Sequence, residues 1–291
     1  MPSVVYQSIF RPELFAGQAV VVTGGGSGIG RCTAHELASL GAAVALVGRK
    51  PEKLAAVAAE IAEDGGRASV HTCDIREEPA VRATVASILA AHGRIDGLVN
   101  NAGGQFQAPL ADITQKGWET VVRTNLTGGF LMARECYTQW MRDHGGAIVN
   151  IVADMWMSMA GMGHSGAARA GMVNLTMTAA VEWGASGVRV NAVAPGWIAS
   201  SGFDTYPDSV KPMLRSFPRH TPLQRYGTEA EVSAAIVFLL SPAAAFISGD
   251  TLRVDGAAPN ARRHVELEAH DRSKPWNGFH RSKTPDLLRE E

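Results

Sequence analysis

A glycine-rich run near the N-terminus has the spacing of a nucleotide-binding loop. Gly24, Gly28 and Gly30 form a G-x-x-x-G-x-G pattern between an apolar stretch, residues 19–22, and a stretch with helical periodicity, residues 29–40. The first turn of a helix presents free N–H groups and about half a positive charge, and glycine lets a pyrophosphate approach that backbone closely. The order of strand, glycines and helix therefore predicts a dinucleotide site. Its predicted contacts are Gly24, Ser27, Gly28, Ile29 and Gly30.

The end of the second apolar stretch indicates which dinucleotide is bound. Sites for NAD usually place an acidic residue there to hold the ribose hydroxyls. This chain has Gly48-Arg49-Lys50 instead, and two cations suit a 2′-phosphate better than free hydroxyls. We therefore expect NADP, bound as NADPH, with Arg49 and Lys50 at its phosphate.

Apolar stretches and helical stripes alternate along the chain and would position this loop. Seven short apolar stretches are predicted strands, at residues 19–22, 43–47, 68–73, 95–99, 147–152, 188–193 and 251–254. Helical periodicity falls between them, at residues 29–40, 54–61, 81–89, 118–131, 167–183 and 229–240. Uniformly apolar strands are typical of a parallel sheet buried on both faces. The pattern predicts a single-domain α/β fold, a Rossmann-type doubly wound parallel sheet of seven strands with helices on both faces.

Two segments do not fit the alternation. Residues 198–228 form a long stretch of the kind that often covers a binding site, so we expect a substrate lid there. Residues 261–291 are rich in charged residues and poor in aliphatic ones, and are either disordered or docked on a neighbour; Trp276 and Phe279 favour docking. The predicted organisation is a dinucleotide-binding domain over residues 1–260, followed by a polar C-terminal extension.

The composition excludes several classes of protein. The 291 residues include 27 Lys and Arg against 28 Asp and Glu, whereas a nucleic-acid-binding protein needs a basic surface. The three cysteines have neither the spacing of a disulfide framework nor that of zinc ligands, so no metal site is predicted. No signal peptide is recognisable and no uncharged run is long enough to span a membrane. We therefore expect a cytoplasmic protein with no nucleic-acid or membrane partner.

Three further motifs, together with the glycine loop, carry a family resemblance. They are Asn100-Asn101-Ala102-Gly103, Asn125-Leu126-Thr127-Gly128 and Asn191-Ala192-Val193-Ala194-Pro195-Gly196. Through them residues 15–256 resemble the short-chain dehydrogenase/reductase family, whose members are NAD(P)-dependent enzymes. The resemblance implies adenine contacts near Asp74 and Ile75, and a homotetramer. It also implies cofactor contacts at Asn101, Ala102, Gly103, Pro195, Gly196 and Ile198.

The catalytic positions depart from the family's usual pattern. The family has a serine after the fifth strand and a Tyr-x-x-x-Lys that opens the next helix, where the tyrosine is the acid–base. Here Ala153, Ser165 and Arg169 stand at these three positions. Arg169 can hold a ribose hydroxyl, but its pKa above about 12 prevents it from relaying a proton. A serine hydroxyl is a poor acid, so ordinary alcohol–ketone interconversion, which must protonate an alkoxide, is disfavoured.

Two stretches are similar to those of one subgroup, the peroxisomal trans-2-enoyl-CoA reductase-like members. They are residues 101–106, Asn-Ala-Gly-Gly-Gln-Phe, and residues 164–171, His-Ser-Gly-Ala-Ala-Arg-Ala-Gly. The resemblance implies NADPH-dependent reduction of the 2,3 double bond of an enoyl-CoA. Hydride adds to Cβ, positioned donors stabilise the enolate oxygen, and Cα then takes a proton. These members carry a tyrosine four residues after the arginine, where this chain has Val173.

Five residues are candidates for this chemistry. Ser165 would donate to the enolate oxygen and Arg169 would hold the ribose. Asn125, which in the family bends its helix and holds a water, would support a water-mediated proton. Asp154, and Tyr206 in the lid, are alternative acids.

The loop before Ser165 indicates the kind of substrate. It carries Met155, Trp156, Met157, Met159 and Met162. Methionine adapts to irregular apolar shapes, so the loop favours an apolar acyl or terpenoid chain, although core or subunit packing explains it equally well. Two alternatives stay open. One is a dehydrogenase or reductase of an apolar alcohol, aldehyde or ketone, and the other is a nucleotide-binding scaffold or sensor that has lost catalysis.

Overall fold

A seven-stranded sheet forms the centre of the protein. The computed structural model describes residues 5–205, 208, 211–261, 267 and 269–289. The strand order is β3-β2-β1-β4-β5-β6-β9, and every neighbouring pair is parallel. The strands are β1 (Ala19–Thr23), β2 (Ala43–Gly48), β3 (Arg67–Thr72), β4 (Gly97–Asn100), β5 (Gly146–Ile151), β6 (Val188–Pro195) and β9 (Thr251–Val254). The predicted fold class and the seven strands are confirmed.

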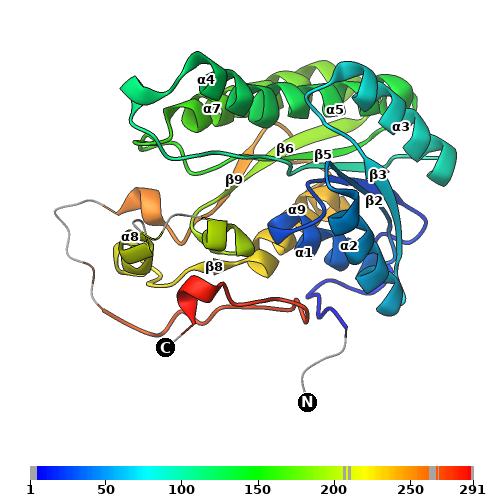
Figure 1. Ribbon diagram of the computed structural model, residues 1–291. Helices are drawn as coiled ribbons and strands as arrows, with labels where there is room; N and C mark the ends of the chain where they lie inside the picture. The colour runs from blue at the N-terminus through cyan, green and yellow to red at the C-terminus, as the bar shows by residue number, and fades with distance from the viewer. Residues whose placement is uncertain (1–4, 206–207, 209–210, 262–266, 268, 290–291) are drawn as a thin grey trace.

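Helices cover both faces of the sheet, as Figure 1 shows. One face carries α1 (Gly28–Ser39), α2 (Pro51–Glu63) and α9 (Glu229–Leu240). The other carries α3 (Glu78–His92), α4 (Gln115–Val122), α5 (Gly128–Cys136) and α7 (Gly163–Trp183). The sequence explains several helix ends: Pro51 occupies the first turn of α2, Gly93 ends α3 in a left-handed conformation, and Thr228 and Glu231 form a capping box on α9.

The first strand shows why the central strands are mostly apolar. Val20 and Val22 pack in the core on one face of the sheet, and Val21 packs in the core on the other. Successive strand side chains point to opposite faces, so a strand covered on both sides has no polar face. At the edge strand β3 the expectation of uniform burial is wrong, because Val70 is 39% exposed there.

The strand order reverses at β1, whose neighbours are β2 and β4. Ligands of open α/β sheets bind outside the carboxyl ends of the strands at such a switch point. Val22 of β1 pairs with Val99 of β4, so the loops that follow these two strands lie side by side. The fold therefore brings the glycine loop next to Asn101.

The helix expected around residues 118–131 is part of a longer run with two π-helical turns. The first, η2 (Arg123–Thr127), joins α4 to α5, and the second, η3 (Tyr137–Met141), leads into the short helix α6 (Arg142–His144). Such turns occur frequently at functional sites. Asn125 lies in the first of them.

The lid segment (residues 198–228) contains short helices. They are η5 (Ser201–Thr205), α8 (Lys211–Ser216) and η7 (Phe217–His220), and the pair β7 (Ile198–Ala199) and β8 (Gly227–Thr228) lies at the base of the segment. The C-terminal extension (residues 261–291) is described over residues 269–289, which pass below α9 and α1 and return toward α8 (Figure 1). The docking that Trp276 and Phe279 favour takes place on the chain's own helices.

Candidate active site

The glycine loop is tied to the residues that follow β4. The Thr23 hydroxyl accepts hydrogen bonds from the backbone N–H groups of Asn101 and Ala102, both at 3.0 Å. A Cβ at Gly30 would lie 2.4 Å from the Asn101 side-chain nitrogen, and Gly24 has a φ of +66°. Both positions therefore need glycine. The loop keeps a cradle open at the amino end of α1, where a pyrophosphate binds best.

Two adjoining cavities run along the switch point. The smaller, of about 210 Å³, is lined by Gly24, Ser27, Arg49, Asp74, Ile75, Asn101, Ala102 and Gly103, among others. The larger, of about 1250 Å³, is lined by Ile29, Asn101, Gly103, Arg169, Pro195, Gly196 and Ile198, and by lid residues. Asn101 and Gly103 line both, so the cavities form one crevice. Its walls carry most of the predicted cofactor residues and fit a dinucleotide; Gly28, Gly30 and Lys50 line neither cavity.

Cations gather at the smaller cavity. Arg49 and Arg76 both line it, and the Arg76 guanidinium forms an ion pair of 2.5 Å with Asp74. Hydrogen bonds from Arg76, with a contribution from the Arg49 charge, lower the pKa of Asp74 to about 2. Lys50 is exposed. Sequence reasoning missed Arg76, although its position two residues after Asp74 was a usable signal.

Arg169 is a half-buried cation that has no carboxylate partner among the described residues. It donates to the Ile151 carbonyl at 2.5 Å and packs on Gly103, where a Cβ would lie 2.5 Å from its Nη2 atom. Among the described residues no acid contributes to its electrostatics, and its buried Nε has no hydrogen-bond partner. Burial lowers the pKa of Arg169 to about 10, so it remains charged at neutral pH. The wall of the larger cavity therefore carries an uncompensated positive charge.

Ser165 reaches the larger cavity through another side chain. It is fully buried in the first turn of α7 and donates to the Gln105 side-chain oxygen at 2.8 Å. Gln105 lines the cavity and Ser165 does not. Because Ser165 occupies that oxygen, the amide NH₂ of Gln105 is left as a donor. Gln105 was not a predicted site residue, and its place in the Asn-Ala-Gly-Gly-Gln-Phe stretch was the available signal.

Asn125 holds the loop that follows β4. Its side-chain oxygen accepts from the Gly104 N–H at 2.8 Å, and its NH₂ group donates to the Gly104 carbonyl at 2.9 Å. The residue is only 2% exposed. Its position in a π-helical turn fits the expected bend of the helix. The role of Asn125 in holding a water stays a prediction.

Asp154 lies beside a second carboxyl group. Burial and the nearby Asp255 raise the pKa of Asp154, and the charge of Arg253 opposes them. Asp154 Oδ1 and Asp255 Oδ2 are both buried without a hydrogen-bond partner in the described part of the chain. The three residues before Asp154 line the larger cavity. Asp255 was missed because only the pairing of β6 with β9 brings it here.

Three further predictions concern Tyr206, metal binding and membrane-spanning helices. Tyr206 lies outside the described residues. In the part of the chain that is described, no three His, Cys, Asp or Glu side chains are arranged to hold a metal ion. None of the helices described there is long and apolar enough to cross a membrane.

The fold and crevice define a Rossmann-type dinucleotide-dependent oxidoreductase, and comparison with known proteins gives its family. A family profile described as "Enoyl-(Acyl carrier protein) reductase" matches residues 24–257. The chain belongs to the short-chain dehydrogenase/reductase family and is an NAD(P)-dependent oxidoreductase of that family.

Similar proteins have different substrates in their names. The chain is 38% identical to a probable 2,4-dienoyl-CoA reductase of Bacillus subtilis, over 82% of this chain and 95% of that protein. It is also 38% identical to a glucose 1-dehydrogenase of Gluconobacter oxydans, over 84% of this chain and 92% of that protein. A solved structure, a citronellol catabolism dehydrogenase of Pseudomonas aeruginosa PAO1, is 66% identical with a TM-score of 0.79, covering 87% of this chain and 99% of that one.

Proposed function

We propose that the protein is an NADPH-dependent reductase of the 2,3 double bond of an enoyl thioester such as an enoyl-CoA. One observation carries the proposal: the cavity wall has the unpaired cation Arg169 and the donor Gln105, which Ser165 orients. These groups stabilise negative charge on an oxygen but are poor proton donors to it. An enolate formed by hydride addition needs such stabilisation. A ketone reduction needs a proton on the same oxygen.

Each candidate residue then has a role in the proposed reduction. The bound cofactor supplies the hydride. Arg169 holds the ribose and keeps positive charge at the cavity, and the Gln105 amide, which Ser165 orients, donates to the thioester oxygen. Asn125 fixes the loop that carries Gly104 and Gln105. Asp154, whose pKa lies above its usual value, supplies the proton to Cα, and Tyr206 is the alternative acid.

The cofactor proposal rests on the cations of the smaller cavity. Arg49 and Arg76 line it and no carboxylate other than the ion-paired Asp74 lines it among the described residues. We therefore expect Arg49→Asp to weaken NADPH binding by about 10-fold or more while NADH binding changes little, since one phosphate contact of this kind contributes about 1–3 kcal/mol. Equilibrium titration of nucleotide fluorescence measures both. An unchanged ratio of the two affinities would contradict the assignment.

The test of the reaction is a substrate panel. The purified protein is mixed with NADPH and a 2-enoyl-CoA of medium chain length, or with ketones and aldehydes of similar size, and loss of the reduced nicotinamide absorbance is followed. Turnover of the enoyl-CoA supports the proposal. Turnover of ketones alone would overturn it. Tight NADPH binding without turnover of any substrate would favour a scaffold or sensor.

A second candidate is a dehydrogenase of an apolar terpenoid alcohol. The observation that favours it is the 66% identity to the citronellol catabolism dehydrogenase. The same panel therefore includes citronellol with NADP⁺. Reduction of the nicotinamide by citronellol, without reaction of any enoyl-CoA, would select this function.

The assembly and location of the protein are also proposals. Members of the family often form homotetramers, and we expect the same here, in the cytoplasm. Light scattering on the purified protein measures the assembly, and a monomer would contradict it.

A further inference from the structure

The C-terminal extension joins two distant parts of the molecule. Residues 276–281 lie against α1, α2 and the start of α9, and residues 286–288 lie against the lid segment. The matching family profile ends at residue 257, so the extension lies outside it. Its contacts are specific enough to assign it a role.

The first attachment combines an apolar plug with ion pairs. Phe279 is 2% exposed and packs with Tyr6, Cys32 and Ala230. The Arg281 guanidinium lies 2.7 Å from the Asp64 carboxylate of the α2 end.

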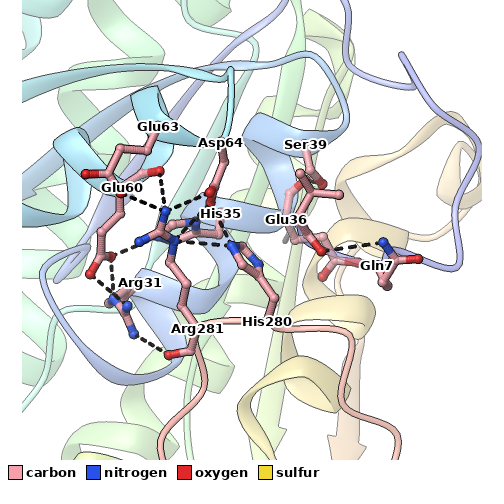
Figure 2. A network of polar contacts seen from close by, with 11 residues as sticks. Gln7, Arg31, His35, Glu36, Ser39, Glu60, Glu63, Asp64, His280 and Arg281 are labelled. Carbon is pink, nitrogen blue, oxygen red and sulfur yellow. Dashed lines mark hydrogen bonds and ion pairs between the residues drawn. The ribbon is translucent and has the colours of Figure 1, made fainter. Parts of the chain in front are cut away.

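Figure 2 shows the polar part of this attachment. His280 Nε2 lies 3.0 Å from Asp64, Arg281 also pairs with Glu63 at 2.9 Å, and Arg31 of α1 donates to the Arg281 carbonyl at 3.2 Å. This end of the extension is therefore fixed to the same helices that carry the cofactor loop.

The second attachment reaches the substrate side. Leu287 is 5% exposed and forms a cluster with Phe203 and Leu214 of the lid segment, against which Trp197 and Tyr226 also pack. The Asp286 N–H donates to the Asp204 carboxylate at 3.0 Å. Leu287 is therefore buried against the lid segment.

Two residues at this attachment also face the larger cavity. Trp197 and Phe203 line it. Phe203 belongs to the cluster that contains Leu287, and Trp197 packs against that cluster. This cluster joins the cavity wall to the extension, so Leu287 supports the wall without lining the cavity. Truncating such a buried side chain leaves a void into which its neighbours relax.

We infer that Leu287 is a positioning residue for substrate specificity, acting through Phe203 and Trp197 to set the width of the cavity that receives the apolar chain. This rests on the proposed function for the identity of the cavity as the substrate site. The extension connects that wall to α1 and α2. Truncation of Leu287 widens the larger cavity and leaves the residues predicted to bind the cofactor in place.

The test compares Leu287→Ala with two controls. Leu287→Met keeps the volume and should restore wild-type behaviour, and Lys283→Ala changes an exposed residue of the same extension. With enoyl-CoA substrates of increasing chain length, Leu287→Ala should change the ratio of kcat/KM between long and short chains by about 10-fold, through KM, since pocket contacts of one or two methylene groups discriminate by that much. Its kcat and NADPH affinity should stay unchanged. An equal loss for all chain lengths would overturn the inference.

A second measurement does not depend on the substrate. Arg215 and Arg219 are exposed trypsin sites in the lid segment. Leu287→Ala should increase cleavage there by about 10-fold, because the lid loses a buried contact and opens more often. Faster cleavage of Leu287→Ala, with no enoyl-CoA turnover by the wild type or any variant, would support the contact of Leu287 with the lid segment and contradict the proposed function. Unchanged cleavage in Leu287→Ala would defeat the inference itself.

Discussion

At the scale of single residues, Arg169 is where the chain gives up stability to place a charge. Burial lowers its pKa to about 10, a shift that corresponds to a cost on the order of 3 kcal/mol for the charged form. In the part of the chain that is described, the Ile151 carbonyl is the hydrogen-bond acceptor that offsets this cost. A half-buried cation with so little compensation is retained for what it does to a ligand.

Replacing this charge should therefore separate stability from activity. We expect Arg169→Met to raise the free energy of unfolding by about 1–2 kcal/mol, since an apolar side chain of similar length has no desolvation cost. Turnover should fall by about 100-fold, the typical effect of losing one charge-stabilising group. Urea unfolding and steady-state kinetics measure the two effects. A variant that is both less stable and fully active would contradict this account.

The raised pKa of Asp154 predicts how kcat depends on pH. Burial and Asp255 raise its pKa, and an acid works only while protonated, so kcat should fall as pH rises through that pKa. Asp255→Asn removes the like charge and should move this fall to lower pH. Asp154→Asn should abolish the fall and reduce kcat by about 100-fold or more. A profile of kcat against pH for the wild type and the two variants tests this. If kcat falls at the same pH in Asp255→Asn as in the wild type, Asp255 does not raise the pKa of Asp154.

The residues found from sequence differ physically from those that were missed. Gly24 and Gly30 were predictable because local backbone geometry requires glycine in a strand-to-helix turn. Arg76, Gln105 and Asp255 depend on side-chain partners that only the fold brings together. Asp255 lies about one hundred residues after Asp154 in the chain, and no local pattern links them.

At the scale of elements, the contact between α1 and α9 places an acid at the glycine loop. A Cβ at Gly28, the first residue of α1, would lie 3.9 Å from Oε1 of Glu229, the first residue of α9. Burial raises the pKa of Glu229 to about 7, against the opposing charge of Arg31. The folded protein therefore prefers this carboxyl group protonated.

The sign of the resulting pH effect follows from linkage. The stability that protonated Glu229 contributes is fully present below the usual pKa of 4.5. It is lost as pH rises toward the folded value of about 7. Glu229→Gln should thus be more stable than the wild type by about 1–3 kcal/mol near pH 8 and equally stable near pH 4. Urea midpoints at the two pH values provide the comparison, with the exposed Glu52→Gln as control. Equal stability near pH 8 would count against the raised pKa.

Element types were more predictable than their details. Strong periodicity located the helices at residues 167–183 and 229–240 to within a few residues of α7 and α9. Periodicity did not show the π-helical turn at Asn125, and only the family resemblance indicated a bend there; Asn125 forms tertiary hydrogen bonds to Gly104, which no local pattern reveals. The short helices of the lid segment were missed since they are stabilised by aromatic packing, such as Trp197 stacked on Phe217 at 3.9 Å.

At the scale of the whole molecule, the extension closes the chain on itself. Tyr6 near the start and Phe279 near the end pack with ring centres 5.7 Å apart. Composition alone left the extension as disordered or docked, because its few apolar residues gave no periodicity. The structure shows that those few residues, Trp276, Phe279 and Leu287, occupy the contact points.

The ion pairs of the extension should make this closure depend on acid. Burial acts to raise the pKa of Asp64, but hydrogen bonds from Arg281 and the charge of His280 outweigh it, so the folded value lies below the usual 3.8. The stability that Asp64 contributes is therefore present above about pH 4 and is lost as pH falls through the folded pKa. Arg281→Gln should cost about 1–2 kcal/mol near neutral pH and less near pH 3. Urea unfolding at both pH values measures the difference, and Arg289→Gln, which removes an exposed ion pair, should cost little at either. A loss that is the same near pH 3 would mean that Arg281 stabilises the extension by packing, not by its charge.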